Sequence, residues 1–273
     1  MKQMNNSYKR KKSGLFALLL FMGIGLSLFF SCTKGSDDFL YKGDMLPVTI
    51  KGFNGGKESM EVKLDTVRFK SPIPTGRFDF SEAYLFPEHK NTVKLVVTEQ
   101  NTGKIILERE LKKEEGPATI SFFYMNDKVS DMPEVPAVEE GKLKLIYMFK
   151  PTVTKYTEPV DIVLGKYFWT PKVFEEIDRI KDVKPYEFTK PITISTFSTV
   201  GQQYNGQPTL VSFVAYIYKA GTNELYTEGT AYSWHATSST APKPASSVAS
   251  SKLYVFNEGI QDNSMRFFKE LEL

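Results

Sequence analysis

The stretch that decides the fold is Thr92-Val-Lys-Leu-Val-Val-Thr-Glu-Gln-Asn-Thr-Gly-Lys-Ile-Ile-Leu-Glu-Arg-Glu-Leu111. Two runs within it, Thr92–Thr98 and Lys104–Leu111, are rich in β-branched residues and alternate between apolar and polar side chains. The turn-forming residues Asn101-Thr102-Gly103 separate the two runs. Alternation of period two on both sides of a short glycine-containing turn predicts a β-hairpin.

The same pattern extends in both directions along the chain. Leu46–Phe53 predicts a strand that ends at the turn residues Asn54-Gly55-Gly56, and Met60–Phe69 predicts the next strand. Further strands are predicted at Pro117–Met125, Lys142–Phe149, Val160–Leu164, Ile192–Phe197, Pro208–Tyr218, Glu224–His235, Leu253–Phe256 and Met265–Phe268. Short strands at this spacing predict a mainly β protein with one or two antiparallel β-sandwich domains of Ig-like or prealbumin-like type.

One short helix is predicted, at Pro171–Val183. Thr170 stands where an N-cap residue belongs, and the proline occupies the first turn. At helical spacing, one stripe would contain Val173, Phe174, Ile177 and Ile180.

Composition excludes several classes of protein. The chain has 273 residues, of which 41% are apolar and 25% charged, so it is long enough and apolar enough to bury a core. A single cysteine excludes a disulfide framework and a cysteine-based zinc cluster.

The N-terminus has the pattern of an export signal. Five cations and no acids occur in residues 1–12, and the almost unbroken apolar run Gly14–Phe30 follows. A retained transmembrane helix is the alternative interpretation, since a run of this length lies at the short limit for spanning a bilayer.

The residues after this run favour cleavage. Leu28-Phe-Phe-Ser31-Cys32 resembles the lipobox of bacterial lipoproteins, in which the signal peptide is cut between Ser31 and Cys32 and the cysteine is lipidated. Thr33-Lys-Gly-Ser-Asp-Asp38 is similar to the acidic surface-export signals of Bacteroidota lipoproteins. The resemblance implies a protein anchored in the outer membrane through its acyl chains, palmitate among them, and facing the cell exterior. Two or more chains anchor a protein stably.

Cleavage would also change the charge of the chain. Removal of residues 1–31 takes away five cations, which leaves 30 Lys and Arg against 32 Asp and Glu. The mature chain would then be nearly neutral, so we expect no nucleic-acid partner.

These observations predict the following organisation: a signal peptide at 1–31, a lipidated tether at 32–44, a β-sandwich at 45–126, a linker or long loop at 127–141, and a second β-rich domain at 142–273 with the helix near 171–183. Residues 236–251, rich in Ser, Thr, Ala and Pro, predict a mobile loop with too few large apolar residues to pack. No internal repeat is evident. The layout is similar to that of the small β-sandwich lipoproteins of Bacteroidota, on the segments 46–56, 101–108 and 158–164.

Motifs for catalysis, phosphate binding or metal binding do not occur in the sequence. The two histidines, His89 and His235, are far apart in the chain and are predicted in a loop and at a strand end, so we expect neither a metal site nor a cofactor. The acid pairs at 114–115, 139–140 and 175–176 are interpreted as solvated charge.

One group of side chains suggests a ligand surface. In a hairpin centred at Gly221, alternate residues share one face, and that face would hold Tyr216, Tyr226, Tyr232 and Trp234. If this face is exposed, its rings can stack on sugars or contact a protein. If both faces are buried, the same residues belong to the core.

A possible modification site is Thr66. Asp65-Thr66-Val67 resembles the Bacteroides O-glycosylation sequon, with the threonine as acceptor.

From these features we expect a non-catalytic, lipid-anchored envelope protein that acts as a surface binding module, such as the glycan-binding accessory of a polysaccharide-uptake system. A structural or adhesin-like module that binds outer-membrane proteins is the alternative. A hydrolase of envelope polysaccharide is the third hypothesis, and it would need two carboxylates in a cleft.

Overall fold

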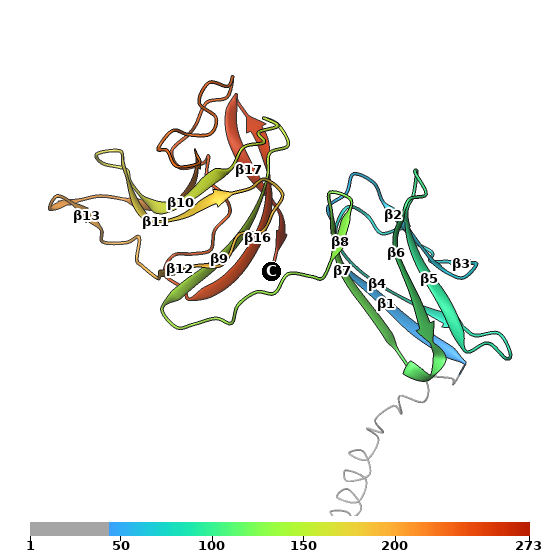
Figure 1. Cartoon of the computed structure of the whole chain (residues 1–273). Coiled ribbons are helices and arrows are strands. Elements are labelled where there is room, and N and C mark those ends of the chain that lie inside the picture. The colour runs from blue at the N-terminus through green and yellow to red at the C-terminus, as the bar shows by residue number, and fades with distance from the viewer. Residues whose placement is uncertain (1–43) are drawn as a thin grey trace, which may run out of the picture.

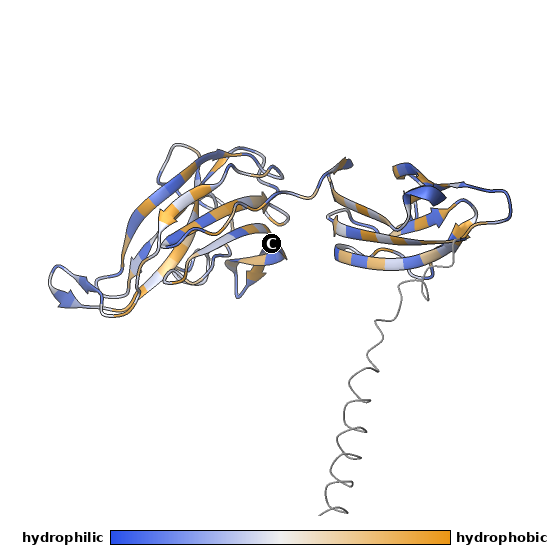
Figure 2. Ribbon diagram, turned by 90° about the horizontal axis from the view of Figure 1, so that it is seen from below, coloured by the Kyte–Doolittle hydropathy of each residue, from blue (hydrophilic) through white to orange (hydrophobic). Residues whose placement is uncertain are grey.

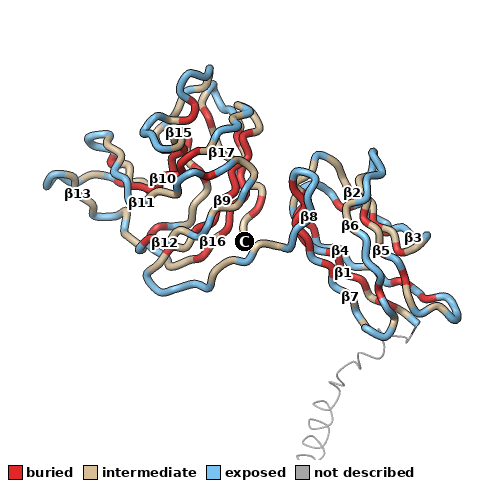
Figure 3. The backbone as a smooth tube through the Cα atoms, viewed as in Figure 1, coloured by how far each residue is buried: buried red, intermediate tan, exposed pale blue. Residues whose placement is uncertain are grey.

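The computed structural model describes residues 44–273, which are mainly β-structure in largely antiparallel sheets, as predicted. The strands form two sandwiches, each with its own buried core (Figures 1 and 3). The predicted signal peptide, Ser31, Cys32 and nearly all of the tether lie outside the described residues. Within them, no helix has the length and hydropathy needed to span a bilayer.

The first sandwich contains two sheets, with the strand orders β4-β1-β7-β8 and β3-β2-β5-β6. Its strands are β1 (Met45–Asn54), β2 (Met60–Leu64), β3 (Val67–Arg68), β4 (Gly76–Leu85), β5 (Thr92–Glu99), β6 (Ile105–Lys112), β7 (Ala118–Met125) and β8 (Lys128–Ser130). A single 3-10 turn, Lys113–Glu115, connects β6 to β7. Hydrophilic and hydrophobic residues alternate along these strands, so the apolar side chains meet between the sheets (Figure 2).

The second sandwich contains the sheets β11-β10-β15 and β12-β9-β16-β17, and a separate hairpin of β13 and β14. Its strands are β9 (Lys142–Lys150), β10 (Val160–Phe168), β11 (Val173–Val183), β12 (Ile192–Ser195), β13 (Gln203–Tyr204), β14 (Gln207–Pro208), β15 (Val211–Lys219), β16 (Ser250–Gln261) and β17 (Ser264–Glu272). The turn between β10 and β11 and the β13–β14 hairpin lie on the side away from the first sandwich (Figure 1).

Both sandwiches follow the same chain route. In the first sandwich, β1 pairs antiparallel with β4 and parallel with β7. In the second sandwich, β9 pairs antiparallel with β12 and parallel with β16. That parallel partner forms a hairpin with the last strand, β8 or β17. In the opposite sheet, the hairpin of β2 and β3 is equivalent to the hairpin of β10 and β11. β2 then pairs with β5 in the first sandwich, as β10 pairs with β15 in the second. The repeat is therefore a property of the fold that the sequence does not reveal.

The predicted hairpin of residues 92–111 is confirmed. β5 and β6 pair antiparallel from Thr92 opposite Lys112 to Thr98 opposite Ile105, with one irregularity near the turn. Most other predicted strands are also present, whereas β4, β8, β13 and β14 were not predicted. β8 lies at the start of the predicted linker 127–141, so the first sandwich extends to Ser130.

The predicted helix at 171–183 is wrong, because these residues form β11. β11 pairs with β10 with two register shifts, one between Leu164 and Gly165 and one between Val160 and Ile162. The first shift leaves Ile177 of β11 unpaired, and the second sets Lys181 and Asp182 of β11 against Asp161 of β10, so each shift gives β11 one extra residue and resets the alternation.

The apolar residues of the predicted stripe do not share one face of β11: Val173 and Ile180 lie opposite Phe168 and Ile162, whereas Phe174 lies opposite Tyr167 on the outer face. Ile177 falls at the first shift and is exposed. Their helical spacing therefore does not mark a buried stripe.

Two other predictions in the second sandwich are corrected. Residues 224–235 form turns rather than the second strand of a hairpin; only Leu225 bridges to β15, at Tyr218. Part of the segment 236–251 packs into the sandwich, with Ser239 and Ala241 fully buried and Ser246 buried, whereas Val248 is exposed. Small side chains let its backbone approach β15, and the backbone N–H of Ala241 donates to Ala215 O at 2.9 Å.

A third apolar cluster joins the two sandwiches. The ring centroid of Phe123 on β7 lies 5.3 Å from that of Phe53. It lies 5.2 Å from the ring centroid of Phe188, which belongs to the second sandwich. The outer face of the sheet β12-β9-β16-β17 packs against this group through Ile146, Met148, Leu253, Val255 and Leu271. The central strands of this sheet, β9 and β16, are consequently buried on both faces over much of their length.

Candidate functional site

The structure places Tyr216 and Tyr226 in the interior. Their exposed fractions are 5% and 1%, so the interpretation of an exposed face formed by the four predicted residues is wrong, and the alternative interpretation as core residues holds for these two. Tyr226 belongs to the core between the sheets, where its hydroxyl donates to the buried carboxylate of Glu258 at 2.8 Å. Burial, followed by the charge of Glu258, raises the pKa of Tyr226.

Tyr232 and Trp234 are partly buried and pack against the same core. The ring of Trp234 lies edge-on to Tyr216 at 5.6 Å and against Phe267 at 5.7 Å. The four predicted residues therefore do not form a common ligand surface.

The remaining predicted residues lie at the surface. Thr66 is exposed in the turn between β2 and β3, and its glycosylation stays a prediction. His89 and His235 are both exposed and lie in different sandwiches. Residues 44–273 contain no group of three His, Cys, Asp or Glu side chains arranged to hold a metal ion.

A different set of aromatic residues gathers on the outer face of the sheet β11-β10-β15, which points away from the core. Odd-numbered residues of β10 share this face with their partners on the neighbouring strands: Tyr167 lies opposite both Phe174 and Ser212. We call this set the aromatic stripe: Tyr167, Trp169, Phe174, Tyr216 and Tyr218. All of these except Tyr216 are partly or largely exposed.

The stripe is closely packed at its centre because Gly165 has no side chain. A Cβ at this position would lie 2.3 Å from the ring of Phe174. The ring instead lies over the glycine and contacts Tyr216, with ring centroids 4.6 Å apart, and Tyr218 at 6.5 Å. Burial raises the pKa of both tyrosines, so their hydroxyl groups stay protonated at neutral pH.

Trp169 is the most exposed ring of the stripe, with 45% of its surface accessible. It follows β10 directly, and its backbone N–H donates to Leu210 O at 3.0 Å. Its indole N–H donates to Ser212 Oγ at 3.0 Å, and its ring lies edge-on to Tyr167 at 5.9 Å. The backbone bond fixes the chain that carries the side chain, and the bond of the indole N–H orients the ring before any ligand arrives.

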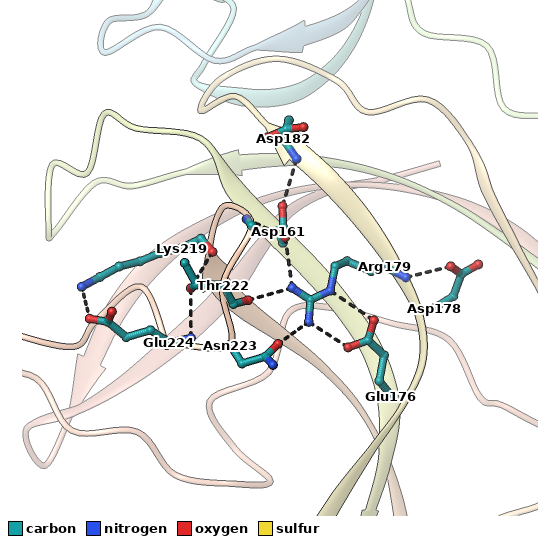
Figure 4. A network of polar contacts seen from close by, with 10 residues as sticks. Asp161, Glu176, Asp178, Arg179, Asp182, Lys219, Thr222, Asn223 and Glu224 are labelled. Carbon is teal, nitrogen blue, oxygen red and sulfur yellow. Dashed lines mark hydrogen bonds and ion pairs between the residues drawn. The ribbon is translucent and has the colours of Figure 1, made fainter.

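Arg179 on β11 closes the other end of the stripe. Its guanidinium carbon lies 5.6 Å from the ring centroid of Tyr218, a cation–π contact. The guanidinium donates to both carboxylate oxygens of Glu176 and to Asp161 Oδ2, and these two acids raise the pKa of Arg179 (Figure 4). All N–H groups of the guanidinium donate to acceptors within the chain. Arg179 therefore positions Tyr218 and has no N–H group left to bind an anionic ligand.

Asp161 is the buried centre of this network. Its side chain is 1% exposed and accepts hydrogen bonds from Arg179 and from the backbone N–H groups of Asp182 and Gly221. These bonds tie β10 to β11 and to the loop after β15 (Figure 4). The network therefore fixes the strands that present the stripe.

The segment that pairs with Trp169 across the sheet is uncharged. Residues 191–218 contain no Asp, Glu, Lys, Arg or His, although a quarter of the whole chain is charged. Near the indole, this stretch supplies the hydroxyl groups of Thr209, which accepts from the N–H of Thr170, and of Ser212. This long uncharged run, with its many Gln, Asn, Ser and Thr side chains, was the sequence signal that could have located the site.

Comparison with known proteins adds no family. No protein-family model matches the chain, and a search of curated proteins finds no match. The class that the fold and site define is therefore a two-sandwich β protein with an aromatic outer face.

Proposed function

We propose that this protein is a lipid-anchored protein of the bacterial cell surface that binds glycans through the aromatic stripe. The observation that carries the proposal is the pre-oriented, exposed indole of Trp169 at the end of a row of aromatic rings. Sugar rings present C–H faces that pack on aromatic faces, and hydroxyl groups that need polar partners.

The charge pattern supports a neutral ligand. The rings of Trp169 and Tyr167 are bordered by hydroxyl groups, and the nearby segment 191–218 contains no charged side chain. A peptide or nucleic-acid partner would be expected to meet complementary charges at the centre of its binding face.

The position of the stripe also fits a surface role. β1 begins at one end of the molecule, and the β10–β11 turn lies on the far side of the second sandwich (Figure 1). If Cys32 carries the lipid anchor, as its resemblance to a lipobox implies, the stripe belongs to the sandwich that is farther along the chain from the anchor.

The test is affinity electrophoresis of the full chain, solubilised in mild detergent, through gels that contain one polysaccharide each. We expect at least one neutral polysaccharide to retard the protein, and Trp169→Ala to weaken that retardation at least tenfold. Loss of one stacking aromatic typically removes about 1–3 kcal/mol of binding free energy, by analogy with bases on aromatic platforms.

The matched control is Phe268→Ala, which removes an aromatic side chain of similar exposure from β17, outside the stripe. Retardation should be unchanged in this variant. If no polysaccharide retards the wild-type protein, or if both variants bind equally well, the stripe is not a glycan site. Release of soluble sugar during the assay would instead support a hydrolase.

A protein-binding module is the second candidate. The observation that favours it is the exposure of two aliphatic side chains in residues 196–210, Val200 at 82% and Leu210 at 74%. Exposed apolar groups next to aromatic rings are typical of protein interfaces.

A further inference from the structure

The second sandwich has a hollow where the first has a regular strand. In the first sandwich, β6 pairs with the edge of β5. At the equivalent edge of β15, the segment 239–246 takes its place: the N–H of Ala241 donates to Ala215 O, and Ser239 Oγ donates to Met265 O of β17 at 2.6 Å. This irregular segment therefore spans from one sheet to the other and leaves space beside it.

The space is a hollow of about 310 Å³. It is lined by Thr240, Ala241, Pro242, Lys243, Tyr254, Phe267, Lys269 and Glu272. Prolines at 242 and 244 flank Lys243, and they restrict the backbone on both sides of it. The lysine is thus held at the wall of the hollow by a stiff piece of chain.

Lys243 has no counter-ion within the described residues. No hydrogen bond or ion pair of its amine occurs between residues 44 and 273. The carboxylate of the hollow, Glu272, is ion-paired with Lys269 and with Lys252, the latter at 2.9 Å. Burial without a partner lowers the pKa of Lys243 to about 8.

Tyr254 adds a second hydrogen-bond donor. The residue is 2% exposed, lines the hollow and has no hydrogen-bond partner for its hydroxyl in the described part of the chain. Burial, and then the charge of Glu272, raises its pKa, so the hydroxyl stays protonated. The hollow therefore offers two hydrogen-bond donors, the amine of Lys243 and the hydroxyl of Tyr254, while the carboxylate of Glu272 is already ion-paired.

The local charge is positive. Lys243, Lys252 and Lys269 together outnumber the single carboxylate of Glu272, and the ring of Phe267 supplies an apolar wall. A neutral ligand would leave the buried ammonium group uncompensated, whereas an anion would compensate it.

We propose that this hollow binds the carboxylate group of a small organic acid. The ammonium group of Lys243 and the hydroxyl of Tyr254 donate to the carboxylate, and Phe267 packs against the body of the ligand. This site shares no residue with the aromatic stripe and does not depend on glycan binding there.

The test measures ligand binding to the full chain in mild detergent by calorimetry, with two matched pairs of probes: benzoate against benzamide, and glucuronate against glucose. We expect at least one carboxylate to bind, and its neutral partner to bind at least tenfold more weakly. The pair that shows the difference identifies an aromatic or a sugar body.

Two variants locate the site. Lys243→Met should weaken carboxylate binding at least tenfold and Tyr254→Phe several-fold, while Lys190→Met, an exposed lysine of the same sandwich, should leave it unchanged. Equal affinity of acid and neutral partner, or full affinity in Lys243→Met, would overturn the proposal.

A measurement on the wild-type protein avoids any effect of the variants on folding. Acetylation of Lys243 by a small anhydride at pH 8, followed by peptide mass spectrometry, should slow at least threefold in saturating benzoate or glucuronate. The neutral partners should not slow it, and the acetylation of Lys190 should not change. Equal rates for Lys243 with acid and neutral probes would contradict a carboxylate site.

Discussion

The two sandwiches share one chain route but differ in what their outer faces carry. In the first, the outer faces are polar outside the junction with the second sandwich: Thr49 is hydrogen-bonded to Ser81, and Lys94 is ion-paired with Glu108. In the second, β9 and β10 each contain six consecutive buried residues, so both of their faces are covered. An ordinary sandwich buries one face of each strand, whereas these two strands of the second sandwich are buried on both faces.

Each apolar outer face of the second sandwich has a different neighbour. One packs against the first sandwich through the cluster around Phe123, and the other carries the aromatic stripe. The same topology can thus serve as a support in one copy and as an interaction domain in the other. The difference lies in the outward-facing residues and not in the order of the strands.

The two sandwiches also differ in how they hold a partly buried charge. Asp65 in the first sandwich accepts from Lys90 Nζ at 2.5 Å, from Tyr84 Oη and from the N–H of Lys94, both at 3.0 Å. Desolvation acts to raise the pKa of Asp65, but these bonds together lower it. Lys243 in the second sandwich has no such partner within the described residues, so its charge costs stability.

We expect the largest change in the free energy of unfolding from a comparison of two valines on equivalent strands. Val214 on β15 is fully buried on the outer face, while Val96 on β5 is partly exposed opposite Lys63. Val214→Asp should lower the free energy of unfolding by about 3–5 kcal/mol, since it buries an unpaired charge. Val96→Asp should cost about 1 kcal/mol or less. Urea denaturation followed by tryptophan fluorescence and circular dichroism measures both; equal losses would break the comparison.

The next effect concerns the junction between the sandwiches. Phe123→Ala should destabilise the protein by about 3 kcal/mol, because it removes a buried ring from the cluster that joins them. Calorimetry should then show two separated unfolding transitions where the wild-type protein shows coupled unfolding. Phe268→Ala, at an exposed aromatic residue, is the control, and a single transition in both variants would argue against coupling through this cluster.

The smallest expected effect is a stabilisation of the protein, whereas the two preceding variants destabilise it. Lys243→Met should stabilise the protein at pH 7 by roughly 1–2 kcal/mol, less than the full pKa shift implies because the side chain is only partly buried. The folded-state pKa of about 8 lies below the usual lysine value of 10.5. The cost of the charge is therefore fully present below pH 8 and disappears as the pH rises to 10.5.

Melting temperatures of the two proteins between pH 6.5 and 10.5 measure this gain. The difference should shrink steadily across the upper half of that range. A constant difference at all pH values would mean that the methionine acts through packing and not through charge.

Local sequence was sufficient to predict much of the fold. The hairpin of β5 and β6 follows from alternation on both sides of Asn101-Thr102-Gly103, since each side is set by neighbours in the chain. The failure at 171–183 has a tertiary cause. The unpaired residues of β11 depend on how it pairs with β10, and no pattern within β11 reveals a bulge.

The candidate site was less accessible to sequence reasoning. The sequence pattern predicted an aromatic face that contains Tyr216, but it placed that face in a hairpin with residues 224–235. The structure instead brings Phe174 and Tyr167 to the same face as Tyr216, from segments much earlier in the chain. Which rings meet is decided by strand pairing, and Gly165 makes room for one of them.

The parallel pairing within each sandwich governs the order in which the chain can fold. β1 and its parallel partner β7 both lie in the first half of the chain. β9 begins at Lys142, but its parallel partner β16 begins only at Ser250. A polypeptide that emerges N-terminus first can therefore complete the first sandwich long before the second. Until β16 emerges near the end of synthesis, β9 lacks its central partner and exposes apolar side chains on both sides. Pairing over so long a loop makes the second sandwich the slower to fold and the more exposed to aggregation during synthesis.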